Sequence, residues 1–91
     1  MNRYDFGLRA FEARLNVTWQ GQNGDLLDPV PFDASDADVI RSAEQALRVG
    51  SVSGMGAQRR PALAGFVVDR FAATEQIPYN RIFLRPKTPF G

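Results

Sequence analysis

The side chains that most often perform chemistry in proteins are nearly absent from this sequence. Its 91 residues contain no cysteine and no histidine, and Lys87 is the single lysine among eleven basic residues. These absences exclude disulfides, thiolate nucleophiles, and histidine as a general base or metal ligand. Because carboxylates, hydroxyls and two tyrosines are nearly all that remain, we expect no enzyme, no catalytic residue and no cofactor.

The remaining candidates for chemistry have simpler interpretations. Asp33, Asp36 and Asp38 lie close together, but a calcium loop needs more oxygen ligands and a downstream glutamate at fixed spacing. We therefore interpret these acids as residues of a helix start and predict no metal site. Lys87 has no neighbouring base, so a nucleophilic role has no support.

Charge divides unevenly along the chain. Residues 1–47 carry a balance of −4, and residues 48–91 carry +5. A basic half is one property of nucleic-acid-binding proteins, and Arg81, Phe83 and Arg85 alternate as in a base-stacking surface. The excess is small, so we favour an ordinary bipolar surface and expect no nucleic acid as partner.

No segment predicts a membrane or an export signal. No apolar run approaches the ~20 residues that span a bilayer. The first residues, Met1 to Asp5, also lack the apolar stretch of a signal peptide. We therefore expect a cytoplasmic protein with no membrane as partner.

Apolar and polar residues alternate over residues 10–20, which is typical of a strand with one buried face. The buried row would comprise Phe11, Ala13, Leu15, Val17 and Trp19. Residues 3–9 are open between an extension of this strand and a short helix. Residues 21–25 contain Asn-Gly and predict a hairpin turn. Two prolines in residues 26–32 predict an irregular edge strand paired with residues 11–20.

Residues 35–49 predict the one helix. Ser35 is a favourable N-cap, Asp36 and Asp38 lie at the positive end of the helix dipole, and Gly50 suits the left-handed residue after the helix. An apolar stripe at helical spacing comprises Val39, Ile40, Ala43, Ala46 and Leu47. Residues 50–61 predict a flexible loop, whereas residues 66–71 and 79–85 predict two strands. One helix and about four strands predict a two-layer α+β domain whose helix covers one face of a single sheet.

The order of these elements resembles the β-grasp fold of ubiquitin over about residues 11–91. As in ubiquitin-like proteins, a short Asp33–Asp36 segment opens the helix, and a basic strand, Arg81–Arg85, leads to a glycine at Gly91. The resemblance implies a β-grasp domain over residues 11–85, with a mixed sheet packed on the helix at 35–49. Residues 1–10 would then be an N-terminal extension and residues 86–91 a flexible C-terminal tail.

The resemblance also implies a function. In ubiquitin-like modifiers a partner enzyme adenylates the terminal glycine carboxylate, which then passes to a target as an ester or thioester. For this chain, the resemblance implies conjugation at Gly91. It also implies contact with partners through a set of tail residues: Arg85, Pro86, Lys87, Thr88, Pro89 and Phe90. The partners would be activating and conjugating enzymes, a deconjugating peptidase and target proteins. Because eukaryotic modifiers have glycine where this chain has Phe90, a dedicated set of partners is expected.

The composition adds an expectation about origin, and two alternatives stay open. The arginine-rich, lysine-poor composition suits a GC-rich bacterial genome, so we expect a bacterial modifier of the kind associated with phage defence. One alternative is a sulfur carrier with a thiocarboxylate on Gly91, although such carriers usually end in a double glycine. The other is a non-covalent β-grasp module that binds by strand addition at residues 26–32 or through a patch that contains Phe83.

Overall fold

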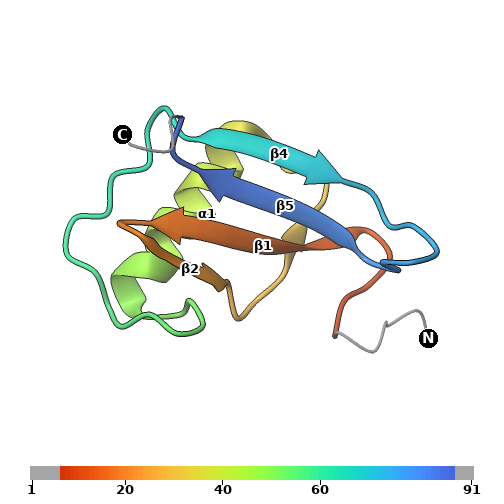
Figure 1. The fold of residues 1–91 in the computed structure, drawn as a ribbon, viewed down its shortest axis with the longest axis horizontal. Helices are drawn as coiled ribbons and strands as arrows, with labels where there is room; N and C mark the ends of the chain where they lie inside the picture. Colours follow the sequence, from red (N-terminus) through yellow and green to blue (C-terminus); the bar gives the residue numbers. More distant parts are fainter. Residues whose placement is uncertain (1–6, 88–91) are drawn as a thin grey trace.

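The computed structural model describes residues 7–87 and consists of one mixed sheet and one helix (Figure 1). The elements are β1 (Glu12–Trp19), β2 (Gln22–Asp25), β3 (Val30–Pro31), α1 (Asp36–Val49), β4 (Val67–Phe71) and β5 (Asn80–Arg85). The strand order is β2-β1-β5-β4, and β3 also pairs with β1. The central strands β1 and β5 are parallel, and the other pairings are antiparallel. The predicted α+β architecture, consistent with a β-grasp fold, is confirmed, with five strands rather than about four.

The core lies between α1 and one face of the two central strands. Leu15 and Val17 of β1 are fully buried beside Ile82 and Leu84, their register partners on β5. From the helix, the core takes Val39, Ala43, Ala46 and Leu47. Period two in the strands and period three to four in the helix therefore put their apolar residues on the same interface.

The two ends of the predicted apolar row of β1 are less buried than its middle. Phe11, expected at its start, precedes β1 and is 62% exposed, because Glu12 N–H donates to the Arg9 carbonyl and turns the chain there. Trp19, expected as a core residue, is partly buried and packs against the core, with its ring centroid 6.3 Å from that of Phe66.

The helix begins and ends where its capping residues predict. The Ser35 hydroxyl accepts a hydrogen bond from the Asp38 N–H at 3.1 Å, and Gly50 adopts the left-handed conformation with φ of 78°. The hydrogen bond from Arg41, with a smaller contribution from Ser35, holds the pKa of the Asp38 carboxyl below its usual range.

The predicted turn at residues 21–25 is wrong. The β1–β2 turn consists of Gln20 and Gly21, which have positive φ values of 51° and 78°, because Trp19 pairs directly with Gln22. Two consecutive residues of positive φ suit the twist of a tight hairpin. Asn23 lies inside β2 instead, where its side chain exchanges hydrogen bonds of 2.7 and 3.0 Å with that of Asn16.

Residues 50–61 are irregular, as predicted, and part of this segment covers the edge of the sheet. Ser53 N–H donates to the Asp25 carbonyl at 2.8 Å, and Leu27 N–H donates to the Ser51 carbonyl at 3.0 Å. Val52 is 2% exposed. Since these bonds occupy backbone groups at the end of β2, they leave less of the edge for strand addition within residues 26–32 than the sequence predicts.

The segment before β1 is anchored in the fold over its described part. Residues 7–11 contain neither a helix nor a regular strand, and Leu8 is fully buried. No helix in the described part of the chain is long and apolar enough to cross a membrane.

Candidate partner-binding face

Within residues 7–87, no helix or strand covers the face of the sheet opposite α1, which we call the open face (Figure 1). Because side chains alternate along a strand, burial of Ile82 and Leu84 under the helix turns the residues between them to this open face. Among the residues that face outward are Arg81, Phe83 and Arg85 on β5, Asp69 and Phe71 on β4, Glu12, Arg14, Asn16 and Thr18 on β1, and Asn23 and Asp25 on β2.

Two aromatic rings and one guanidinium meet at the β4–β5 end of this face. We call Phe71, Arg81 and Phe83 the β4–β5 cluster. The Phe71 and Phe83 rings meet edge to face with centroids 5.7 Å apart, and the Arg81 guanidinium carbon lies 5.3 and 5.6 Å from these centroids. The antiparallel register pairs Phe71 directly with Arg81. This geometry allows cation–π attraction to both rings, which fixes the arginine side chain on the surface.

The arginines of this face differ in their partners. Arg85 forms an ion pair with Asp69 across the two strands. The Arg81 side chain makes no hydrogen bond or ion pair with any residue in the described range 7–87, and its Nε atom is buried without a hydrogen-bond partner. A shallow hollow of about 340 Å³ lies over this region, lined by Asp69, Phe71, Arg81, Phe83 and Arg85. Of the two arginines that line the hollow, Arg85 is therefore paired with a carboxylate and Arg81 is not.

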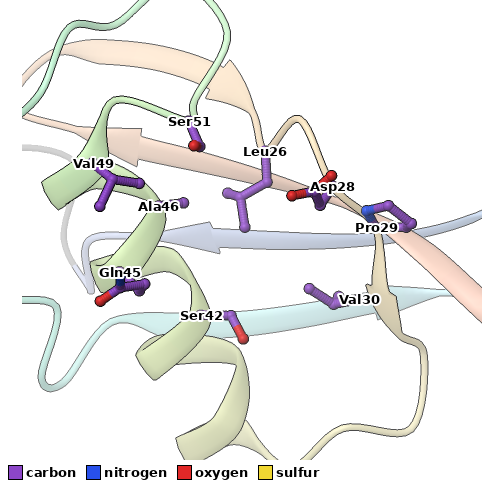
Figure 2. A pocket seen from close by; sticks show the side chains of 9 residues that line it. All are labelled: Leu26, Asp28, Pro29, Val30, Ser42, Gln45, Ala46, Val49 and Ser51. Atoms are coloured by element: carbon purple, nitrogen blue, oxygen red, sulfur yellow. The ribbon is translucent and has the colours of Figure 1, made fainter.

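A second hollow lies between α1 and the chain that joins β2 to β3 (Figure 2). It has a volume of about 280 Å³ and is lined by Leu26, Asp28, Pro29, Val30, Ser42, Gln45, Ala46, Val49 and Ser51. Asp28 is the one charged side chain among these lining residues, so the hollow has no paired carboxylates for acid–base chemistry. It is an apolar groove with a polar rim.

Of the predicted tail residues, Arg85 lies beside the β4–β5 cluster, Pro86 and Lys87 lie elsewhere, and the other four lie outside the described residues. Arg85 ends β5, and Pro86 and Lys87 line a hollow of about 480 Å³ with Trp19 and Phe66. The other predicted tail residues, Thr88, Pro89, Phe90 and Gly91, lie outside the described residues. Among the tail residues that the structure describes, Arg85, Pro86 and Lys87, only Arg85 therefore contributes to the open face.

Two of the three acids at the helix start, Asp36 and Asp38, are bound by arginines. Asp36 accepts a hydrogen bond of 2.7 Å from Arg70, and Asp38 pairs with Arg41. In residues 7–87, no group of three acidic side chains is placed to hold a metal ion. These carboxylates act in the structure as helix-start and strand-to-helix contacts.

Sequence reasoning found two members of the β4–β5 cluster and missed the third. The sequence offers Phe83 as a candidate patch residue and Arg81 as a candidate base-stacking residue, but it assigns no role to Phe71. The alternation of residues 66–71 puts Phe71 on the same face as Asp69, but apolar residues on both faces hide which face is open.

Comparison of the chain with models of protein families, with curated proteins and with solved structures finds no match.

Proposed function

We propose that this chain is a ubiquitin-like recognition domain, which partner proteins bind through the open face of its sheet. The observation that carries the proposal is the β4–β5 cluster. Aromatic residues and arginine are enriched at the energetic centres of protein interfaces. Phe71 is 46% exposed, and its ring is held in place by Phe83 and Arg81, so the Phe71 side chain would lose little entropy when a partner binds it.

Truncation of Phe71 tests this proposal. In quantitative affinity purification with the full chain, we expect Phe71→Ala to lower the recovery of specific partners about 30-fold, the effect of a ~2 kcal/mol interface residue. Leu27→Ala is the matched control, because Leu27 is also exposed, at 61%, but lies on the chain after β2. Equal recovery with both variants, at unchanged thermal stability, would contradict recognition by the open face.

We also propose that this domain is conjugated to target proteins through the Gly91 carboxylate, as the resemblance to ubiquitin-like modifiers suggests. Its support is the topology: β5 is a central strand parallel to β1, and Pro86 follows its last residue. A proline has no N–H to extend the ladder and favours an extended chain. Activating and conjugating enzymes, a deconjugating peptidase, a bacterial origin and a role in phage defence belong to this proposal.

Deletion of Gly91 tests the conjugation proposal. A chain that ends at Gly91, incubated with ATP and an adenylating enzyme encoded beside its gene, is expected to form a covalent adduct through its terminal carboxylate. The chain that lacks Gly91 is expected to form none, as measured by intact mass and gel shift. An adduct of equal yield from the deleted chain would refute conjugation at Gly91. A mass gain of one sulfur-for-oxygen exchange would instead identify a sulfur carrier.

A further inference from the structure

We infer that the β4–β5 cluster binds a carboxylate of the partner protein, with Arg81 as its receptor. This inference rests on the proposed recognition by the open face and names the chemistry of the partner. The ligand would be an aspartate or glutamate beside an apolar side chain, with the acid on Arg81 and the apolar group on Phe71.

The first argument is that Arg81 is held ready for an anion. Its guanidinium carbon lies between 5 and 6 Å from both ring centroids of the cluster, so two aromatic faces restrict a side chain that is otherwise flexible. A guanidinium fixed in this way presents its fork of N–H donors with less entropy to lose when a carboxylate binds. Paired Arg–carboxylate hydrogen bonds are among the stronger hydrogen bonds of proteins.

The second argument is that the acids on this face are already engaged. Asp69 pairs with Arg85, the Asp25 carboxylate accepts a hydrogen bond of 2.8 Å from the Asn16 amide, and the Glu12 carboxylate accepts the Arg9 N–H at 2.8 Å. None of these interactions reaches Arg81.

The third argument concerns the shape and the sign of the surroundings. The hollow over the cluster, about 340 Å³, is wide enough for side chains and not only for an ion, and Phe71 offers its exposed ring at one side. Asp69 is paired with Arg85, but two further carboxylates on the open face, Glu12 and Asp25, form no ion pair within residues 7–87. They would repel the row of phosphates in a nucleic acid, whereas a single carboxylate can contact Arg81 alone. The charges therefore favour an acidic protein segment over a nucleic acid.

A displayed library of random short peptides, selected on the folded full chain, tests the inference. We expect the selected peptides to share an acidic residue beside an apolar one. In synthetic versions, replacing the acid by its amide should weaken binding about 10- to 100-fold, the range for a hydrogen bond between charged groups. Arg81→Gln should cause a similar loss, and the two losses should not add, because they remove the same contact.

Matched variants separate the inference from its premise. Arg48→Gln, on the exposed last turn of α1, is the control for charge and should leave binding unchanged. Peptides that lose binding with Phe71→Ala but not with Arg81→Gln would overturn the carboxylate receptor while supporting the open face as the binding surface. Peptides unaffected by both variants, or failure to select any binder, would overturn both. Tight binding of a single-stranded oligonucleotide that Arg81→Gln abolishes would overturn the assignment to an acidic protein.

Discussion

Replacement of Asn80 by alanine is expected to lower the free energy of unfolding by about 3 kcal/mol, because three hydrogen bonds of a buried side chain are lost at about 1 kcal/mol each. Asn80 is the first residue of β5 and is 8% exposed. Its amide nitrogen donates to the carbonyls of Ala10 and Glu12 at 3.0 and 3.1 Å, and its oxygen accepts the Ala73 N–H at 2.9 Å. One side chain therefore joins the segment before β1 to the connection after β4.

Urea unfolding followed by circular dichroism measures this effect. Asn23→Ala is the matched control, because Asn23 also lies in a strand and hydrogen-bonds Asn16 and Thr18, but its side chain is exposed. Water can replace those partners, so we expect Asn23→Ala to change the free energy of unfolding by less than about 0.5 kcal/mol. Equal destabilisation by Asn80→Ala and Asn23→Ala would show that the Asn80 hydrogen bonds do not stabilise the fold more than exposed ones do.

The helix and the two central strands could be predicted because their signals are local. Ser35 and Gly50 adopt the cap conformations that their residue types favour. The alternation in residues 12–19 and 80–85 sets their buried faces without reference to any partner. Hydrophobic periodicity and helix capping depend on neighbours in the sequence, so the elements that they predict are present in the tertiary structure.

The position of the hairpin turn could not be predicted correctly, because Asn23-Gly24 competes with Gln20-Gly21 as a turn sequence. Asn23-Gly24 is a strong turn sequence in isolation. The register that places Gly24 opposite Val17 instead lets Asn23 bond Asn16 and puts Gly24 under the loop at Val52 and Ser53. Those contacts are tertiary, and local propensity contains no information about them.

The candidate site also contains residues that the sequence alone identifies and one that only the strand pairing reveals. Arg81 and Phe83 stand out because they alternate on a strand whose buried face is plain from the sequence. Phe71 joins them only through the antiparallel register that pairs it with Arg81. That register depends on the closure of residues 72–79, where Thr74 N–H donates to the Ile77 carbonyl at 2.8 Å. A cluster built across two strands therefore needs the pairing before it can be recognised.

Replacement of Gly24 by alanine is expected to lower the free energy of unfolding by about 2–3 kcal/mol, because the interior at this point has no room for a methyl group. A Cβ on Gly24 would lie 2.2 Å from the Ser53 carbonyl oxygen and 3.0 Å from Val52 Cγ1. The Ser53 backbone is fixed by its hydrogen bond to the Asp25 carbonyl. The loop must therefore move away from β2, which exposes Val52 and uncovers the edge of the strand.

Gly56→Ala is the control that separates this clash from a general effect of replacing glycine in or beside the same loop. A Cβ on Gly56 would meet no atom within 4 Å, and its φ is not positive. We therefore expect Gly56→Ala to be neutral or to stabilise the fold by up to about 1 kcal/mol through the unfolded state. Hydrogen exchange at the Leu27 and Ser53 amides should accelerate in Gly24→Ala and stay slow in Gly56→Ala. Unchanged exchange and stability in Gly24→Ala would mean that residues 51–53 do not cover the end of β2, and that this edge is open to a partner strand after all.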